Sequence, residues 1–337
     1  MGDGEVTTGV GTGPLVGQRV LVTGAGGQLG GYLRPALLAA GAEVVGLGAR
    51  RGPGVDLHGD ITDAAGIAAA VRDARPAAIV HAAAYTDVDG CERDPARADA
   101  VNAAGAAHVA AAARATGAYL LAVGTDFVFA GDGGAPYAED APTAPISTYG
   151  RSKLAGERAV LGANPAFAVA RTAWLYGGPA KHFPRTVLTV LRARGTIEVV
   201  ADEAGSPTFA GDLADALVAL LVARGAGRFH LTNAGRATRF ELAQAVAAAA
   251  GFDPAAVRPT TTADFLARYP LPARRPPEST LTNTRAAGLG VRLRPWQDAV
   301  AAYAPLLAAE LGLGPTPISA NPPGHDPMPS TQPPQGD

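Results

Sequence analysis

The segment RVLVTGAGGQLG, residues 19–30, decides the fold class. Its first five residues form a short apolar run typical of a buried strand, and a helical pattern follows to about Ala40. Glycines between the two allow a tight turn that approaches a pyrophosphate closely, with the N–H groups of the helix N-terminus facing that anion. The chain has 43 glycines, so the spacing alone is weak, and a glycine-rich turn of another α/β protein is the alternative. The strand–turn–helix context favours dinucleotide binding. We expect the contacts from Gly24, Gly27, Gln28, Leu29 and Gly30.

Apolar runs alternate with helical patterns through the next part of the chain, with strands expected at 43–47, 78–84, 119–124 and 166–171. This alternation predicts a Rossmann-type α/β fold with a doubly wound parallel sheet. The order of segments predicts a disordered leader at 1–16, then a mainly NAD(P)-binding Rossmann domain at 17–180. A smaller C-terminal α/β substrate-binding lobe follows, mainly at 181–313 with some chain crossing back, and then a disordered Pro-rich tail at 314–337.

The composition narrows the function classes. Hydrophobic residues make up 47% of the chain, charged residues only 17%, and the net charge is −2, with no basic block of the kind that binds nucleic acid. The single cysteine, Cys91, fits a reducing compartment. No secretory signal pattern and no uncharged run of membrane-spanning length is present. We therefore expect a cytoplasmic protein without nucleic-acid or membrane partners.

The stretch after the second expected strand bears on the cofactor. An acid often follows that strand in NAD-binding folds and holds the ribose hydroxyls. Here Arg50 and Arg51 follow instead, which favours the 2′-phosphate of NADPH, although NADH remains possible and a solvated arginine loop is the alternative. Asp60 and Ile61 come a few residues later, where they would contact the adenine. The small residues Ala82, Ala83 and Ala84 would let a dinucleotide lie against the backbone.

A tyrosine and a lysine four residues apart form the candidate catalytic pair. Tyr149 and Lys153 share one face of a predicted helix, and the chain contains only two lysines. A surface lysine beside a half-buried tyrosine is the alternative. Reduction of a ketone needs a proton donor, and a nearby ammonium lowers the pKa of a tyrosine. Thr125, at the end of a neighbouring strand, would hydrogen-bond the carbonyl oxygen, or would instead cap a turn.

Several longer motifs together carry a family resemblance: GGQLG (26–30), AAAYTDVD (82–89), TDFVF (125–129), YGRSKLAGE (149–157) and RTAWLY (171–176). They resemble the dTDP-4-dehydrorhamnose reductase family of the extended short-chain dehydrogenase/reductase superfamily, over roughly residues 18–312. The resemblance implies NADPH-dependent reduction of the 4-keto group of a dTDP-4-dehydro-6-deoxyhexose, first of all dTDP-4-dehydro-L-rhamnose to dTDP-L-rhamnose.

The resemblance also implies roles for single residues. Tyr149 would donate the proton, Lys153 would hold the nicotinamide ribose, and Thr125 would complete the triad. The sugar side would be lined by Thr86, Val88, Thr125, Asp126, Tyr149 and Trp174. For Trp174 a core position is the alternative, and for Asp126 a turn role.

Other functions remain open from the sequence. One is 4-ketoreduction of a different dTDP-deoxysugar. Another is an epimerase or dehydratase of the same superfamily, against which Asp126 is followed by Phe127 rather than Glu. A third is a non-catalytic relative like the regulatory subunit of methionine adenosyltransferase. Some relatives are metal-linked dimers, but the sequence shows no clear acidic cluster, so we predict no metal site and a monomer or homodimer.

Overall fold

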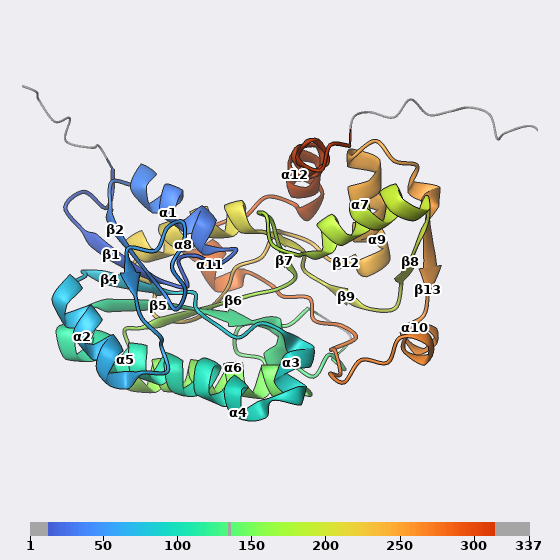
Figure 1. Cartoon of the computed structure of the whole chain (residues 1–337). Helices are drawn as coiled ribbons and strands as arrows, with labels where there is room; N and C mark the ends of the chain where they lie inside the picture. The colour runs from blue at the N-terminus through green and yellow to red at the C-terminus, as the bar shows by residue number, and fades with distance from the viewer. Residues whose placement is uncertain (1–12, 134–135, 314–337) are drawn as a thin grey trace, which may run out of the picture.

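A seven-stranded, fully parallel sheet forms the centre of the molecule (Figure 1). The computed structural model describes residues 13–133 and 136–313. The strand order is β11-β6-β5-β4-β1-β2-β3. The bounds are β1 Arg19–Thr23, β2 Glu43–Gly48, β3 Leu57–His58, β4 Ala78–His81, β5 Tyr119–Thr125, β6 Ala168–Thr172 and β11 Gly227–His230.

Helices cover both faces of this sheet, which confirms the predicted doubly wound fold. One face carries α1 (Gly30–Ala39), α8 (Ala210–Val222) and α11 (Thr284–Gly288), and the other carries α2 (Ala64–Ala74), α5 (Ala106–Thr116) and α6 (Thr148–Ala163). Strand β1 contributes to the hydrophobic core on both faces of the sheet. Val20 and Val22 pack on the face of α1 and α8, whereas Leu21 between them packs on the face of α2 and α5. A strand buried on both faces is apolar at every position, as in an all-parallel sheet.

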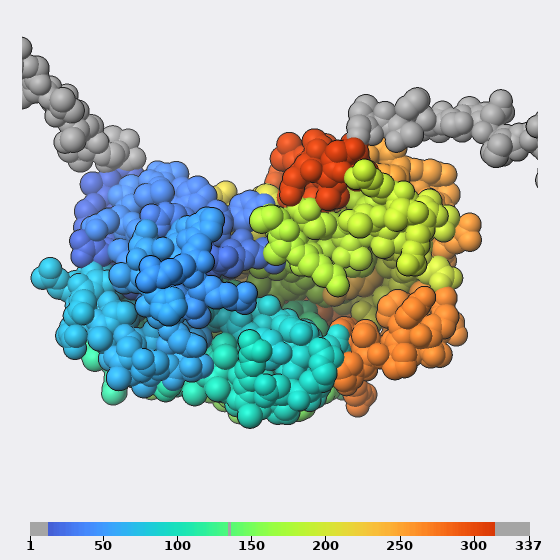
Figure 2. Space-filling model, in the orientation of Figure 1, coloured from blue at the N-terminus to red at the C-terminus, as the bar shows by residue number. Residues whose placement is uncertain are grey.

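A smaller lobe lies beyond the carboxyl ends of the sheet strands (Figure 1). Its core is formed by α7 (Phe183–Arg194), α9 (Arg239–Ala249) and α12 (Trp296–Glu310). Three short strand pairs complete it: β8 (Ile197–Val200) with β13 (Val257–Thr260), β7 (Leu175–Tyr176) with β10 (Thr208–Phe209), and β9 (Ala204–Gly205) with β12 (Ala237–Thr238). Helix α10 (Thr262–Arg268) and the short turn η3 (Pro254–Ala256) lie at its edge. Figure 2 shows the molecular surface hollowed between the segment bearing α1 and helix α12.

The Ala-rich stretch 95–116 is helical without a gap, but it is not one regular α-helix. The structure has α3 (Val88–Arg93), α4 (Pro95–Ala98), a π-helical turn η1 (Asp99–Gly105) and then α5. A π-helical turn inserts an extra residue into the helical ladder and often marks a functional site. The Ala-rich sequence does not reveal this turn, in which Asn102 makes the contacts described below.

The chain ends and the crossovers also refine the sequence prediction. Residues 13–16, which were expected in the leader, belong to the fold: Leu15 is 2% exposed and its N–H donates to the Ala40 carbonyl at 2.9 Å. Residues 1–12 and the predicted tail at 314–337 lie outside the described residues. Strand β11 pairs with β6 at the edge of the central sheet, so the chain returns from the lobe to the Rossmann sheet. In the described ranges no helix is long and apolar enough to cross a membrane.

Candidate active site

The glycine turn after β1 is built for close backbone approach. Gly24 has φ +71°, and a Cβ there would lie 2.8 Å from the Ala83 Cα. A Cβ on Gly30 would lie 2.3 Å from the Ala25 carbonyl oxygen. Leu29, the N-cap of α1, makes no side-chain cap hydrogen bond, and the positive end of the helix dipole at this place favours an anion. These features fit the pyrophosphate of a dinucleotide.

The other residues expected around the dinucleotide lie in loops next to this turn. Ala82–Ala84 follow the end of β4, and the Gly24–Ala83 contact places that loop against the glycine turn. The Gln28 side chain donates to the Gly177 carbonyl at 2.8 Å, which joins the turn to the loop after β7. Dinucleotide contacts by these residues stay a prediction.

The expected adenosine end of the site is partly exposed. Arg50 and Arg51 lie exposed in the loop after β2, available to a ligand phosphate. Asp60 accepts from the Thr62 N–H and hydroxyl, both at 2.9 Å, and these bonds lower the pKa of Asp60. Ile61 is buried against Gly105. Asp60 and Ile61 therefore have structural roles here, and their adenine contacts stay a prediction.

Helix α6 carries the candidate catalytic pair and approaches its neighbours through glycines. The Ser147 side chain caps it by accepting from the Gly150 N–H at 3.1 Å. A Cβ on Gly150 would lie 2.2 Å from the Phe127 carbonyl, and one on Gly156 would lie 2.1 Å from the Asn102 carbonyl. The two glycines thus bring the helix face with Tyr149 and Lys153 against η1 and the turn η2 (Asp126–Val128).

Tyr149 and Thr125 meet at the carboxyl end of β5. Tyr149 is 9% exposed and packs edge-to-face on Phe127, with ring centroids 5.4 Å apart. Burial raises the pKa of the Tyr149 hydroxyl, while a hydrogen bond with the Thr125 side chain acts in the opposite direction. Thr125 also accepts from the Phe127 N–H at 3.2 Å. Thr125 therefore caps a turn, one of the two readings left open by the sequence, and faces Tyr149, whereas its hydrogen bond to a substrate carbonyl stays a prediction.

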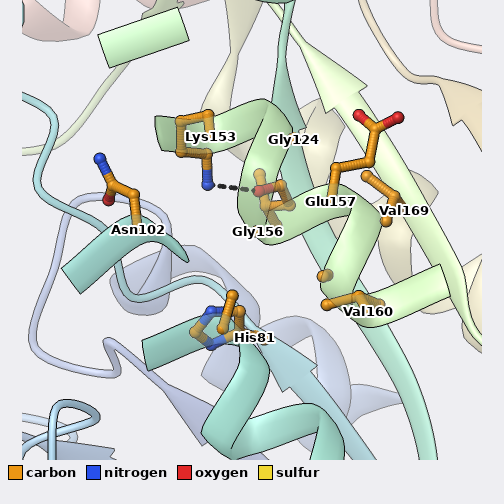
Figure 3. Close-up of a pocket in the computed structure, with 11 residues that line it drawn as sticks. His81, Asn102, Gly124, Lys153, Gly156, Glu157, Val160 and Val169 are labelled. Atoms are coloured by element: carbon orange, nitrogen blue, oxygen red, sulfur yellow. Dashed lines mark hydrogen bonds between the residues drawn. The ribbon is translucent and has the colours of Figure 1, made fainter. Parts of the chain in front are cut away.

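Lys153 sits at a small cavity of about 10 Å³, enough for one water molecule (Figure 3). Its ammonium donates to the Val123 carbonyl at 2.8 Å, and burial lowers its pKa to about 8. His81 lines the same cavity, and its Nδ1 lies 2.7 Å from the Thr23 hydroxyl. Burial, and then the Lys153 charge, lower the pKa of His81 to about 3, so this imidazole is neutral.

The expected influence of Lys153 on Tyr149 is wrong for this structure. Lysine was expected to lower the tyrosine pKa, but burial dominates and raises it. The ammonium is directed at the Val123 carbonyl instead. The desolvation cost of a buried phenolate exceeds the help of its polar neighbours.

Asp126 is a buried carboxyl beside the triad, 2% exposed. Its Oδ1 accepts from the Thr125 hydroxyl at 3.1 Å. Burial raises the pKa of Asp126 to about 6, against the opposing effects of Ser279, Thr125 and the Arg239 charge. Asp126 is also the first residue of the turn η2, so it has the turn role left open by the sequence, and its contact with the sugar stays a prediction.

The loop after β4 is held in place by Asn102, which sequence reasoning treated only as a polar residue amid alanines. Its amide oxygen accepts from the Tyr85 N–H at 2.8 Å, and its amide nitrogen donates to the Tyr85 carbonyl at 3.1 Å and to Ser152 at 3.1 Å. Val88 on this loop packs in the same small cluster as Tyr149, whereas Thr86 is exposed. Substrate contacts by Thr86 and Val88 stay predictions.

Trp174 follows β6 and faces the lobe. It adopts φ +45°, rare for a bulky residue, and a Cβ on Gly205 would lie 2.6 Å from its indole. The Arg239 guanidinium stacks on the indole with 3.5 Å between its Cζ and the ring centroid. No local sequence pattern singles out Arg239, because it approaches Trp174 only through the fold of the lobe. In the part of the chain that the structure describes, no group of three or more His, Cys, Asp or Glu is arranged to hold a metal ion.

Fold and site together define a dinucleotide-dependent reductase or epimerase of the short-chain dehydrogenase type: a glycine turn, a Tyr–Lys helix and a threonine meet at the strand ends of one parallel sheet. Comparison with known proteins narrows this class. The family model described as the RmlD substrate binding domain matches residues 18–308. The chain belongs to the dTDP-4-dehydrorhamnose reductase family, and the predicted family is confirmed.

Three similar proteins illustrate the match. A dTDP-4-dehydrorhamnose reductase of Streptomyces griseus is 45% identical over 306 residues, covering 89% of this chain and 97% of that protein. A probable dTDP-4,6-dihydroxy-2-methyloxan-3-one 4-ketoreductase of Streptomyces antibioticus is 44% identical, covering 87% and 97%. The crystal structure of dTDP-4-dehydrorhamnose reductase from Bacillus anthracis in complex with NADP has a TM-score of 0.79 at 33% identity, covering 85% and 98%.

Proposed function

We propose that this protein is an enzyme that reduces the 4-keto group of a dTDP-4-dehydro-6-deoxyhexose with NADPH. The observation that carries the proposal is the meeting of Thr125, Tyr149 and Lys153 at the carboxyl edge of the sheet, beside the glycine turn. An intact triad argues for turnover rather than for the non-catalytic, regulatory type of relative. The NADP-bound structure of a family member supports the choice of cofactor.

The residues of the cofactor site fit NADPH. The glycine turn would hold the pyrophosphate, Arg50 the 2′-phosphate and Lys153 the nicotinamide ribose. When bound, NADPH supplies the hydride that adds to the carbonyl carbon. Without the family's usual acid after β2, NADH would lack a carboxylate for its ribose hydroxyls, so it is the weaker alternative.

The protein delivers the proton. Because burial raises the pKa of Tyr149, its hydroxyl stays protonated at neutral pH and holds the proton that the substrate oxygen requires. As negative charge develops on that oxygen, it becomes a stronger base than a phenolate, and the proton moves from Tyr149 Oη. Thr125 lies within hydrogen-bonding reach of Tyr149, and its hydroxyl stabilises the phenolate that remains by turning its proton from Asp126 to the phenolate oxygen.

The sugar is the finer part of the proposal. dTDP-4-dehydro-L-rhamnose is the first candidate, supported by the reductase that is 45% identical. A different dTDP-deoxysugar is the second, supported at 44% identity by the relative from S. antibioticus. A cytoplasmic location is proposed on the single cysteine, and the protein would act as a monomer or homodimer without nucleic-acid or membrane partners.

The test is to mix the purified protein with dTDP-4-dehydro-L-rhamnose and follow the absorbance of NADPH, and separately of NADH. We expect oxidation of NADPH faster than of NADH. A panel of other dTDP-4-keto-6-deoxyhexoses, assayed in the same way, separates the two sugar candidates by their kcat/KM. No oxidation of either cofactor with any of these sugars would overturn the proposal.

A further inference from the structure

Arg239, the first residue of α9, has a guanidinium without a hydrogen-bonding partner among the described residues. Its Cζ lies 3.5 Å from the centroid of the Trp174 ring and 5.3 Å from that of Phe183. Its backbone N–H donates to the Glu203 carbonyl at 3.1 Å. Across residues 13–133 and 136–313, however, the guanidinium makes no hydrogen bond and no ion pair. A partly buried guanidinium normally has a hydrogen-bonded partner, so this one invites a ligand.

Three other arginines, unlike Arg239, form ion pairs with carboxylates. Arg275 forms an ion pair with Asp89 at 2.7 Å. Arg236 binds Glu278 at 2.8 Å, and Arg294 binds Asp212 at 2.8 Å. These three arginines thus have carboxylate partners in the protein. Arg239 differs in being stacked on aromatic rings instead.

The stacking fixes the guanidinium without using its donors. Cation–π contact occupies the flat face of the group, whereas all its N–H bonds lie in the plane and point away from the ring. Trp174 cannot move freely beneath it, because Gly205 in β9 fits against the indole with no room for a Cβ. The arrangement leaves a rigid fork of donors, which suits the bidentate binding of phosphate oxygens.

The charge of the group is retained. Burial lowers the pKa of Arg239 to about 10, still well above neutral. Glu203 and Asp126 lie near enough to interact with this charge but not within ion-pair distance, and burial raises the pKa of both carboxyls.

We propose that Arg239 binds the diphosphate of the nucleotide-sugar substrate and so positions its keto group at Tyr149. The proposal rests on the proposed function, which puts C4 of the sugar at Tyr149 and Thr125. Across the sugar ring from C4 lies C1, which carries the diphosphate. Arg239 belongs to the lobe that faces the sheet, and its charge acts on Asp126, the neighbour of Thr125, so its guanidinium lies close to the site of the sugar. Arg239 is thus a positioning and specificity residue, not a proton donor.

The test measures dTDP and thymidine binding by calorimetry, with NADPH present, in wild type and Arg239→Met. We expect Arg239→Met to weaken dTDP binding roughly 10- to 100-fold, the loss of a charge-assisted bidentate contact, and to leave thymidine binding unchanged. In turnover the KM for the dTDP-sugar should rise while the KM for NADPH does not. The matched control is Arg258→Met, an exposed arginine of β13 with the same charge change, which should behave as wild type.

Each outcome decides the proposal. Equal dTDP affinity in Arg239→Met and wild type would overturn it, and so would equal losses for dTDP and thymidine, which would make Arg239 a packing residue for Trp174. If Arg239→Met does not fold, Arg239→Lys takes its place, because lysine keeps the positive charge but lacks the paired N–H donors of the guanidinium. A wild-type dTDP affinity in Arg239→Lys would also reject bidentate binding. A wild-type protein that binds dTDP but does not oxidise NADPH would sink the proposed function while leaving Arg239 as an anion-binding residue.

Discussion

Gly156→Ala tests whether the close contact between α6 and η1 positions the site. The added Cβ would lie 2.1 Å from the Asn102 carbonyl oxygen and 3.1 Å from the Ala106 Cβ. The oxygen belongs to the backbone of a π-helical turn, so it cannot swing away like a flexible side chain. Relief requires α6 to move outward or η1 to rearrange.

The expected cost follows from two opposing effects. Overpacking of this kind costs about 1–3 kcal/mol, and a contact this short belongs in the upper part of that range. Replacing a mid-helix glycine by alanine returns about 0.5–1 kcal/mol. The net loss is therefore about 1–2 kcal/mol, or a fall in Tm of about 2–8 °C in a domain of this size. Activity should fall further, because Asn102 also holds Tyr85 and Ser152.

The matched control lies in the same helix. A Cβ on Gly162 meets nothing within 4 Å, so Gly162→Ala should stabilise the protein by up to about 1 kcal/mol. Urea unfolding and kcat are measured on both variants and on wild type. If the contact matters, the free energy of unfolding falls in Gly156→Ala and rises in Gly162→Ala, and only Gly156→Ala loses activity. A Gly156→Ala variant as stable and as active as Gly162→Ala would refute the reasoning.

Three further predictions concern the proton donor, the cofactor and a buried ion pair. Tyr149→Phe should lower kcat by about 100- to 10,000-fold while NADPH titration shows unchanged binding, and a wild-type rate would remove Tyr149 as donor. Arg50→Ala should raise the KM for NADPH about tenfold and leave that for NADH unchanged; equal KM ratios in variant and wild type would make Arg50 a solvated loop residue. Burial alone would raise the pKa of Glu157, but Arg171, at 2.6 Å, and Arg228 outweigh it and lower that pKa. The ion pair of Glu157 therefore stabilises the fold above the unfolded pKa of about 4.3, and this stabilisation is lost as pH falls through the lower folded pKa. Glu157→Gln should lower the free energy of unfolding by about 3–5 kcal/mol at pH 7 and by less in acid, measured by urea unfolding. A loss that does not depend on pH would contradict the prediction.

Local patterns predicted the parts of the site that are local. The strand–turn–helix at residues 19–30 and the Tyr–Lys spacing on α6 each depend on a short stretch, and the structure has both as expected. The order of strands in the sheet could not be predicted in the same way, because β11 pairs with β6 over a long sequence separation that no local periodicity encodes.

The missed features depend on contacts between distant segments. Asn102 lies in a π-helical turn, where it binds Tyr85 and its carbonyl faces Gly156, and neither residue lies in its own helical turn. Arg239 reaches Trp174 only through the folding of the lobe. The pKa of Tyr149 was expected to fall because its lysine neighbour was visible in the sequence, whereas its burial was not.

The central claim is that a hydride reaches C4 of a dTDP-linked keto sugar at the site of Thr125, Tyr149 and Lys153. The most direct measurement uses NADPH deuterated at the transferred position of its nicotinamide, with dTDP-4-dehydro-L-rhamnose as substrate and NMR of the sugar product. We predict deuterium at C4 of dTDP-L-rhamnose, and almost none formed in the same time by Tyr149→Phe. A product with hydrogen at C4, or oxidation of the cofactor without a reduced sugar, would contradict the claim.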